Sequence, residues 1–342
     1  MSKVLNQHYV PQSYLKYFSY DRNKIFVFDK FSQKTFRTNV RNVASERAFY
    51  DFPDVTQSEN IQNIEQFFSG LEKKQNKFLK HLQKKIYKIF ELRLNSKHIG
   101  KVYSVKVITK EQRKDLAYVI AIQFLRTREF RNFIMEMRQR TEIITNVIVE
   151  GEILDLIAKY EKLLSIKLKQ NSIDTFIYDI LNQCSHNISN IYDKGLPVIH
   201  AKFILEHYET FADILQNHIW MVGINDTGKP LFTSDNPVIK HSHLSHSGID
   251  SEGIEIAFPL NSKIILIMRE RQHFFRHLNQ DSKLFPLTIN DVEYYNKLQI
   301  YNSNRFVFSP DDCFEIVKYI CQEYPEVCSE ERNRITISKL EP

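Results

Sequence analysis

The chain has 342 residues, of which 42% are hydrophobic, and it carries a formal net charge of +6 at pH 7. This composition provides for a large core, and the small numbers of glycine (8) and proline (10) argue against an all-β or loop-rich protein. No apolar run approaches the roughly 20 residues of a membrane-spanning helix, so we expect a soluble protein without membrane contact, whose mild positive charge permits a nucleic acid or another polyanion as partner.

The chain opens with a short amphipathic segment. Residues 8–12 read His-Tyr-Val-Pro-Gln, and Pro11 suits the first position of a helix, where its missing N–H would have no partner. This predicts a helix start beside the side chains of His8 and Gln12. Free backbone N–H groups at a helix start bind anions, so the segment is a candidate anion site.

Strand and helix patterns follow this segment. Residues 24–30 and 34–38 have the pattern of a β-hairpin, and residues 48–50 that of a short edge strand. The clearest helical period of the chain then runs from Ile61 to Leu92, where apolar residues recur mostly three or four positions apart. Seven lysines between positions 73 and 88 alternate with this apolar stripe, and we interpret them as the solvated face of an amphipathic helix.

The middle of the chain is predicted to be helical. Thr109 and Gln112 form a capping-box signature for a long helix over roughly residues 111–149. Further helices are expected at about residues 152–169, 172–184 and 196–216. These helices and the preceding one make a helical insert over about residues 57–215.

Strand patterns return after this insert. Residues 219–223 and 230–233 flank an Asn-Asp-Thr-Gly turn signal, which predicts an antiparallel pair. Residues 254–258 and 263–268 make a second pair, and a helix at about residues 288–298 precedes a strand at 305–308. We expect the N-terminal hairpin to join these strands in one sheet.

The predicted fold class is α+β and predominantly helical, with an antiparallel sheet built from N-terminal and C-terminal segments that flank the large helical insert. One domain spans residues 1–330, and residues 331–342 form a dispensable tail. The cysteines, at positions 184, 313, 321 and 328, show neither a C-x-x-C pair nor a zinc-like spacing, and no secretory leader precedes them. We therefore expect reduced thiols and a cytoplasmic protein, whose oligomeric state the sequence leaves open.

Several motifs occur in an order that is found in a known family. They are the opening His-Tyr-Val-Pro-Gln, the Gln-Phe-Leu-Arg-Thr run at 123–127, Trp220 ahead of Phe-Thr-Ser-Asp-Asn-Pro-Val at 232–238, and Pro259-Leu260. From about residue 7 to 309 the chain resembles an uncharacterised bacterial family, domain of unknown function 4238. The family pattern usually has proline after the Arg-Thr pair, where this chain has Arg128. The resemblance implies a shared site and brings no named reaction with it.

The predicted long helix carries polar side chains on an apolar stripe. Gln123 and Thr127 lie on this stripe, and Arg126 can lean onto the same side. An unpaired buried polar group costs about 1–3 kcal/mol, so these side chains need partners from protein, water or ligand. An internal network, with Asp235 as the partner of Arg126, and a ligand site are both open interpretations.

The Thr-Ser-Asp-Asn-Pro segment at residues 233–237 leaves an apolar strand and enters a turn. Short polar side chains in a turn hydrogen-bond their own backbone, which is a sufficient structural explanation. In the functional alternative, Asp235 orients His8, binds a divalent metal such as Mg²⁺ or Mn²⁺, or acts as a general base.

The leading hypothesis combines these groups into one site, with His8, Asp235 and Arg126 as catalytic residues and Gln12, Gln123, Thr127, Ser234 and Asn236 as substrate-binding residues. An imidazole moves protons near neutral pH, and a guanidinium stabilises charge on a phosphoryl oxygen. This predicts a phosphate-directed hydrolase, a nuclease-like enzyme acting on nucleic acid, used as a toxin or an anti-phage defence effector. The alternative is a noncatalytic ligand-sensing or protein-interaction module whose buried polar network only specifies the fold.

The remaining motifs give weaker evidence for a function. His241, His243 and His246 are interpreted as solvated loop histidines, because no fourth ligand stands at a zinc spacing. The chain has no dinucleotide fingerprint, no phosphate-cradling glycine loop and no serine nucleophile elbow. A restriction-type nuclease is disfavoured, since Asp235 and Glu255 are spaced plausibly but Ala257 stands where a lysine belongs.

Overall fold

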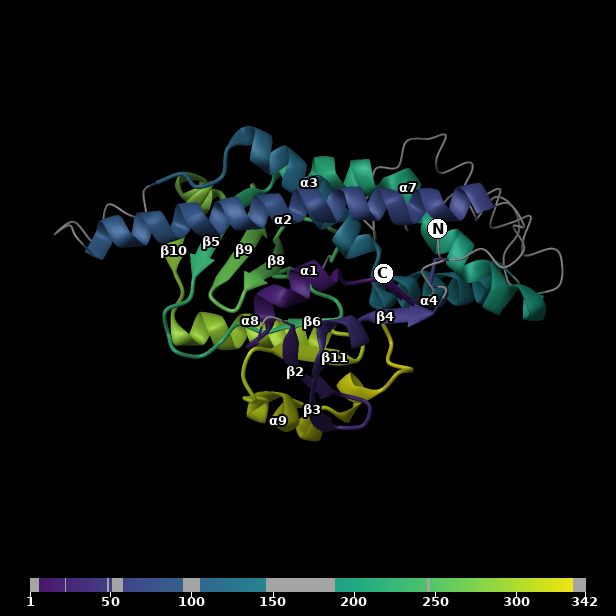
Figure 1. The fold of residues 1–342 in the computed structure, drawn as a ribbon. Coiled ribbons are helices and arrows are strands. Elements are labelled where there is room, and N and C mark those ends of the chain that lie inside the picture. The colour runs from purple at the N-terminus through teal and green to yellow at the C-terminus, as the bar shows by residue number, and fades with distance from the viewer. Residues whose placement is uncertain are drawn as a thin grey trace, which may run out of the picture.

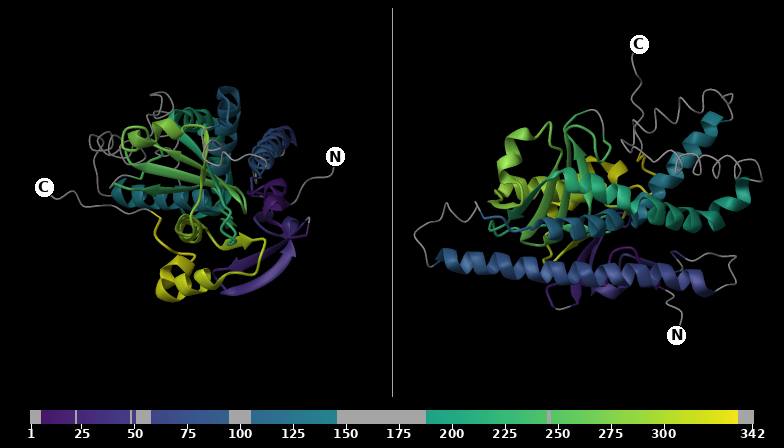
Figure 2. Two further views of the ribbon diagram at one scale, coloured as in Figure 1. Left: turned by 90° about the vertical axis from the view of Figure 1, so that its left-hand side faces the viewer. Right: turned by 90° about the horizontal axis from the view of Figure 1, so that it is seen from above.

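The computed structural model describes residues 6–21, 23–47, 49–50, 58–94, 105–145, 188–244 and 247–334 (Figures 1 and 2). Most strands come from the two ends of the chain, and the long helices α2, α3, α4 and α7 come from the segment between them. The predicted α+β class is therefore confirmed. The helices expected at about residues 152–169 and 172–184 lie outside the described residues.

The elements follow in this order: β1 (Asn6–His8), α1 (Gln12–Leu15), the 3-10 helix η1 (Lys16–Phe18), β2 (Lys24–Asp29), β3 (Lys34–Asn39), η2 (Val40–Asn42), β4 (Ser45–Arg47), α2 (Ser58–Leu94), α3 (Lys110–Leu125), α4 (Arg128–Thr145), α7 (Ile188–Asn217), β5 (Ile219–Ile224), β6 (Thr233–Ser234), β7 (Ile239–Ser242), β8 (Ile254–Asn261), β9 (Ile264–Arg269), η4 (Phe275–Gln280), β10 (Lys283–Pro286), α8 (Ile289–Asn302), β11 (Phe306–Ser309), α9 (Glu315–Glu323) and η5 (Pro325–Cys328). The predicted hairpin, the helix from 61 to 92, the strand pair around Pro259 and the helix before β11 are confirmed. The short edge strand lies three residues earlier than expected, at β4.

Within the described residues the strands form three sheets. The largest has the order β10-β5-β9-β8-β7, a second has the order β3-β2-β11-β6, and β1 pairs with β4. The N-terminal hairpin thus joins C-terminal strands, as expected, but the expectation of one sheet is wrong. All pairs are antiparallel except β10 with β5.

The predicted pairing of residues 219–223 with 230–233 is also wrong. The Asn225 side chain donates to the carbonyls of Lys229 and Ser262 (2.6 and 3.1 Å), and the Leu231 N–H donates to the carbonyl of Ser262 (2.9 Å). These bonds hold the chain after the turn against the β8–β9 turn, so it leaves β5 and enters the second sheet as β6. β5 pairs instead with β9 and β10.

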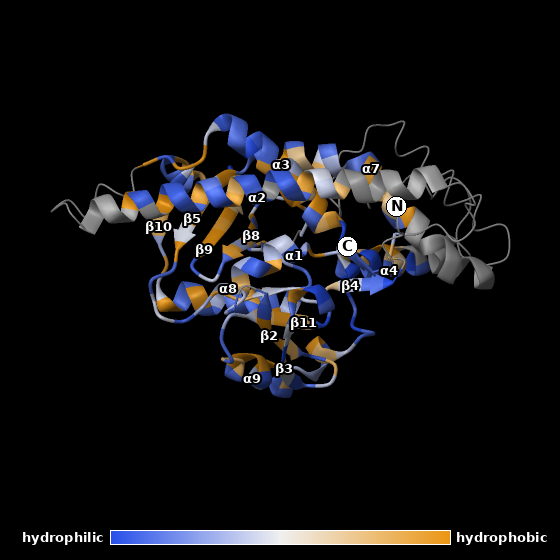
Figure 3. Cartoon of the chain, viewed as in Figure 1, coloured by the Kyte–Doolittle hydropathy of each residue, from blue (hydrophilic) through white to orange (hydrophobic). Residues whose placement is uncertain are grey.

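Helices cover both faces of the five-stranded sheet. Side chains of α3 and α7 pack with Trp220 and Val222 on one face, and side chains of α8 pack with Ala257 and Ile267 on the other (Figure 1). β8 and β9 are hydrophobic along most of their length, whereas α2 alternates hydrophilic and hydrophobic residues (Figure 3). The apolar stripe of α2 faces the core and its lysines lie outside, as the sequence predicts.

The predicted helix over residues 111–149 is two helices. Its capping box is confirmed: the Thr109 hydroxyl accepts from the Gln112 N–H, and the Gln112 side chain accepts from the Thr109 N–H. α3 ends at Leu125, and the Thr127 hydroxyl accepts from the Phe130 N–H at 3.2 Å and so caps the start of α4. Arg128 is the first residue of α4, a position where proline is well tolerated.

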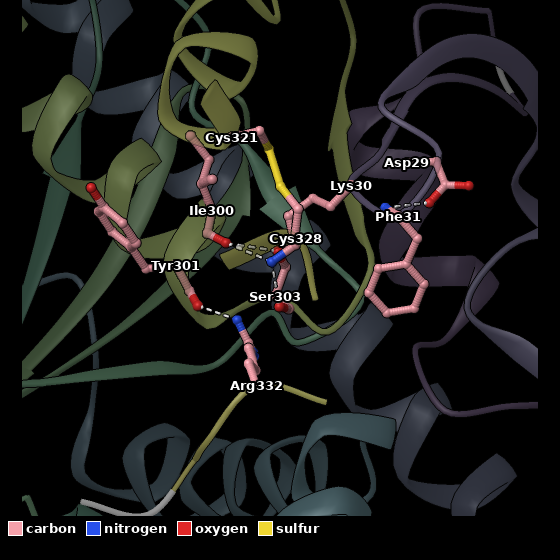
Figure 4. Close-up of a disulfide and its surroundings, with 9 residues drawn as sticks. All are labelled: Asp29, Lys30, Phe31, Ile300, Tyr301, Ser303, Cys321, Cys328 and Arg332. Atoms are coloured by element: carbon pink, nitrogen blue, oxygen red, sulfur yellow. Dashed lines mark hydrogen bonds between the residues drawn. A yellow bond between two sulfur atoms is a disulfide. The ribbon is translucent and has the colours of Figure 1, made fainter. Parts of the chain in front are cut away.

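The C-terminal region corrects one expectation, and its last described residues contact α4. Cys321 and Cys328 form a disulfide (Figure 4), so the prediction of reduced thiols is wrong for this pair, and Cys313 is free. The segment expected to be a dispensable tail is docked as far as residue 334. There Arg332 Nη2 and Arg334 Nε lie 2.5 and 3.2 Å from the two carboxylate oxygens of Glu129 on α4.

No helix within the described residues combines the length and the apolar character needed to cross a membrane.

Candidate functional site

His8 lies on a strand, and the prediction that placed it at a helix start is corrected. It is the last residue of β1, opposite Ser45 of β4, and the helix after it, α1, has only four residues. Its Nε2 is 3.1 Å from the carbonyl oxygen of Arg41. Burial lowers the pKa of the imidazole, more than the Arg41 hydrogen bond and the charge of Glu72 raise it. The neutral ring therefore donates from Nε2, and Nδ1 keeps its lone pair, with no hydrogen bond from the described residues.

Arg126 lies beside His8 at the junction of α3 and α4. Its Nη1 is 3.1 Å from Glu72 Oε1 on α2, its Nη2 donates to the carbonyl of His8, and the guanidinium lies 4.5 Å from the ring centre of Phe68. Its Nε is buried and has no hydrogen-bond partner among the residues that the structure describes. Burial lowers the pKa of Arg126, but Tyr50 and Glu72 outweigh this effect and raise it, so the group stays charged. The partner of Arg126 is Glu72, and the predicted pairing with Asp235 is wrong.

Arg131 on α4 is a buried cation that the sequence analysis missed. Its Nε donates to His200 Nδ1 at 3.1 Å, its Nη2 donates to the carbonyl of Phe49, and the guanidinium lies 3.4 Å from the ring centre of Phe49. Burial lowers its pKa to about 10, so it remains charged at neutral pH. Within the part of the chain that the structure describes, no carboxylate forms an ion pair with it. Three arginines within six residues, 126 to 131, were the available signal.

These groups form one positively charged region, which we call the junction cluster: His8, Glu46, Glu72, Arg126, Arg128 and Arg131. Arg128 pairs with Glu46, and both side chains are partly exposed. Three guanidiniums therefore face two carboxylates, in surroundings where burial weakens screening by water. The cluster combines a neutral proton acceptor with an excess of positive charge, which suits a ligand that carries a phosphate.

Asp235 is fully buried and does not reach the junction cluster through any hydrogen bond of its carboxylate. Its two oxygens accept from the backbone N–H groups of residues 304, 305 and 306, at 2.8, 2.8 and 2.9 Å. Burial raises the pKa of Asp235 to about 6, against these amides and the charge of Lys30, which lower it. Asp235 therefore neither orients His8 nor binds Arg126, and both of its oxygens are in use.

A metal ion at Asp235 is not supported by its surroundings. Among the described residues, no group of three or more histidine, cysteine or acidic side chains is arranged to hold a metal ion. The charge of Lys30 acts on Asp235, and the Lys30 Nζ donates to the carbonyls of Ile300 and Ser303 (3.0 and 2.7 Å) at the end of α8 (Figure 4). Burial lowers the pKa of Lys30 to about 7, and Asp235 opposes this shift. The hydrogen bonds of Lys30 connect the end of β2 to the end of α8.

Four of the five predicted substrate-binding residues hold elements together. Gln123 donates to the carbonyl of Tyr9 (3.1 Å), and Thr127 donates to Asn236 Oδ1 (3.2 Å). Asn236 donates in turn to the carbonyl of Asn302 (2.9 Å), and Ser234 donates to Gln299 Oε1 (2.7 Å). The fifth, Gln12, is exposed at the start of α1 and makes no side-chain hydrogen bond to the described residues. These contacts are those of an internal network.

A second polar group on the five-stranded sheet was missed. His241, Glu255 and Arg269 are direct cross-strand partners on β7, β8 and β9, and we call them the sheet-face row. Glu255 is only 1% exposed, and the signal in the sequence was a carboxylate inside the apolar run from Ile254 to Phe258. His241 is half-buried on a strand, so its interpretation as a solvated loop residue is wrong, and His246 lies outside the described residues.

Comparison with known proteins gives a single result. A family model described as Protein of unknown function (DUF4238) matches residues 6–312. The match spans the elements from β1 to β11, which include the junction cluster and the sheet-face row, and ends before α9. No curated protein and no solved structure matches the chain.

Proposed function

The chain belongs to the family described as Protein of unknown function (DUF4238), and from its junction cluster we propose that it is a phosphate-directed hydrolase, a nuclease-like enzyme that acts on nucleic acid. The observation that supports this most is the buried Arg131, whose partners are the neutral His200 and a backbone carbonyl. Buried charges are normally paired with opposite charges. A phosphate of the substrate would supply the missing negative charge.

In the proposed reaction, His8 acts as the general base. Nδ1 takes a proton from a water molecule, the water oxygen bonds to phosphorus, and the bond from phosphorus to the leaving oxygen breaks. The leaving oxygen takes its proton from solvent. Arg126 and Arg131 stabilise the charge that develops on the phosphoryl oxygens, and one donor for this is the Nε of Arg126, which has no hydrogen-bond partner in the described part of the chain.

A nucleic acid is favoured over a small phosphate ester by the charge on α2. Lys73 follows Glu72 of the junction cluster directly, and the exposed lysines continue along the helix. They are Lys73, Lys74, Lys77, Lys80, Lys84 and Lys88. Across the described ranges, no acidic side chain forms an ion pair with any of them. Because α2 runs along one side of the molecule (Figure 2), its lysine face can neutralise successive phosphates of one strand.

The noncatalytic alternative rests on a different observation. Asp235, Thr127, Ser234 and Asn236 are satisfied by protein groups, as expected for a network that only specifies the fold. In that case the junction cluster binds a phosphorylated ligand without turnover. A cytoplasmic location and a role as a toxin or anti-phage effector belong to the hydrolase proposal.

The proposal is tested with labelled DNA and RNA, incubated with purified protein in Mg²⁺, Mn²⁺ or EDTA. His8→Asn keeps a neutral polar side chain but removes the proton acceptor, so cleavage should fall by about 100-fold or more while nucleic-acid affinity is kept. His273→Ala, an exposed histidine outside the junction cluster, is the matched control and should cleave normally. Cleavage that persists in His8→Asn removes the assignment. Binding without cleavage in the wild-type protein supports the noncatalytic alternative.

A further inference from the structure

The 3-10 helix η4 carries two exposed apolar side chains. Phe275 is 58% exposed and Leu278 is 44% exposed. Residues three positions apart lie on the same side of a 3-10 helix, so these two side chains form one apolar surface, which we call the η4 platform. Single exposed apolar residues are common on proteins, whereas an adjacent pair on a fixed element is a candidate contact surface.

The η4 platform is fixed from its inner side. Phe274, directly before Phe275, is 9% exposed and packs with side chains of β5. The Arg269 guanidinium lies 5.1 Å from the ring centre of Phe274, and its Nη1 is 3.1 Å from His277 Nδ1 within η4. Arg269 is held in turn by the buried Glu255. The sheet-face row therefore anchors η4, and the platform is preorganised for a ligand.

Positive charge lies beside the η4 platform. The Arg276 guanidinium is 5.8 Å from the ring centre of Phe275. Lys283 follows η4 on β10, and its cross-strand partner is Lys106. Within the described ranges, no acidic side chain forms an ion pair with any of these three cations. The surface thus combines an open aromatic ring with cations that can bind an anion.

The acidic side chains of the same segment are already in use. Glu270 and Asp281 are the two acidic residues between positions 269 and 283. The Glu270 carboxylate accepts from three backbone N–H groups of neighbouring turns. Asp281 pairs with Arg113 and Arg271. Neither carboxylate neutralises the cations beside the platform, so their charge is available to a ligand.

Direct contacts connect the η4 platform to α2. The Lys85 Nζ on α2 donates to the carbonyl of Val107 (3.2 Å), and the Val107 N–H donates to the carbonyl of Ser282 (2.8 Å), two residues after the end of η4. Lys106 stands next to Val107 in this connection. Cations therefore occur on each segment between the lysine face of α2 and η4. A strand bound along α2 can continue to the platform.

We propose that the η4 platform binds an unpaired base of a single-stranded nucleic acid. The base stacks on the ring of Phe275 beside Leu278, and the flanking phosphates contact Arg276, Lys283 and Lys106. A base can stack on a protein ring only where it is not enclosed in a duplex, so this site names a single strand as the substrate class. It rests on the proposed function for nucleic acid as the ligand, but not on the cleavage step.

A membrane surface is a less suitable ligand for this platform. Two apolar side chains bury too little surface to anchor a protein, because stable attachment needs a long apolar face or lipid chains. The cations also continue along one helix, α2, which matches a linear polyanion.

The test measures binding to the full chain by fluorescence anisotropy in EDTA. The ligands are labelled oligo(dT) and oligo(U) of about 20 nucleotides and a duplex of the same length. The wild-type protein should bind at least one single strand more tightly than the duplex. Phe275→Ala should weaken that binding by about 5-fold or more, because stacking is lost, and should change duplex binding by less than about 2-fold.

Two further variants control for the loss of an exposed ring. Tyr319→Ala removes a ring on α9 that is 59% exposed and should bind single strands as the wild type does. Phe275→Trp keeps a ring for stacking and should bind at least as tightly as the wild type. Unchanged single-strand binding in Phe275→Ala overturns the platform. Equal binding of single strand and duplex, or binding to phosphatidylserine vesicles but to neither oligonucleotide, also overturns it.

Cleavage measured in the same preparations separates this platform from the proposed hydrolase. A wild-type protein that cleaves, while Phe275→Ala binds normally, overturns the platform alone. A wild-type protein that binds through Phe275 but cleaves nothing overturns the hydrolase alone. His273→Ala should bind and cleave normally, because the His273 ring packs edge-to-face against Phe274, with ring centres 4.7 Å apart, and is not part of the platform.

Discussion

Two buried carboxylates, Asp235 and Glu255, are held in opposite ways. Both oxygens of Asp235 accept from main-chain N–H groups. Glu255 is held by side chains instead: Arg269 donates to its Oε2, and burial, together with the charge and a hydrogen bond of Glu255, raises the pKa values of Tyr294 and Tyr295 on α8. The comparison teaches that a buried carboxylate can be satisfied by main-chain amides or by side chains, and that burial alone does not tell which.

The location of each carboxylate explains this difference. Asp235 follows β6, a strand of two residues, and its carboxylate supplies acceptors to the amides around the start of β11. It therefore completes the edge of the second sheet. Glu255 lies within β8, where the main chain is already paired with β7 and β9. Its side chain is therefore not needed as an acceptor for main-chain amides.

The largest effect is expected at Asp235, where a substitution tests the comparison most directly. Asp235→Ala leaves three buried N–H groups without acceptors, and we expect the free energy of unfolding to fall by about 3–5 kcal/mol. Urea denaturation followed by circular dichroism measures this loss. Asp226→Ala, at an exposed turn position, is the matched control and should change stability by no more than about 0.5 kcal/mol. A loss below about 1 kcal/mol at Asp235 contradicts the structural role.

The next largest effect concerns pH and the buried imidazole of His200. Burial, with the nearby charge of Arg131, lowers its pKa to about 3. Below about pH 6.5 the unfolded chain therefore binds a proton that the folded state does not, so stability falls as pH falls, by about 2 kcal/mol at pH 5 for this group. His200→Gln can keep both hydrogen bonds without titrating, so its loss between pH 7 and pH 5 should be smaller by this amount. Parallel losses in the two proteins would show that His200 does not contribute.

A smaller effect is expected at Glu255. In Glu255→Gln the amide oxygen still accepts from Arg269, but a charged hydrogen bond becomes a neutral one, so the free energy of unfolding should fall by only about 1 kcal/mol. Urea denaturation beside Asp235→Ala measures the difference between the two carboxylates. A loss as large as that of Asp235→Ala would show that the side-chain partners of Glu255 matter as much as the main-chain partners of Asp235, and would remove the contrast.

The smallest effect on stability is expected on the lysine face of α2. Lys77→Ala removes an exposed charge without an ion pair among the described residues, so stability should change by no more than about 0.5 kcal/mol. If this face binds nucleic acid, the salt dependence of binding should fall by about 1 in its log-log slope. Fluorescence anisotropy at several salt concentrations measures the slope. An unchanged slope argues against contact at this position.

Local patterns predicted most of the elements. The hairpin β2–β3, the amphipathic α2, the capping box of α3 and the pair β8–β9 depend on residues close together in the chain, and all were found. Thr127 was placed inside a helix because the apolar period continues through it. The structure uses its hydroxyl as a cap, so the helix divides there. β7 and β10 were missed because each has only four residues, and β10 also pairs with a strand distant in sequence, β5.

The polar residues of the candidate site were conspicuous in the sequence, but their partners were not. Gln123, Arg126 and Asp235 stood out as polar groups in apolar surroundings, and all three are buried. The sequence suggested that Asp235 pairs with Arg126. In the structure Glu72 has that position, because α2 runs along the α3–α4 junction and brings its side chain there.

The amino-acid sequence alone thus determined the fold class, most of the elements and the burial of several polar side chains, among them Gln123, Arg126 and Asp235. Only the tertiary structure decided which of those side chains are satisfied. The acceptors of Asp235 serve amides about 70 residues away in the chain. Every residue except proline carries the same backbone N–H, so such a partner leaves no signature in the sequence, and only the packing of β6 against β11 selects it.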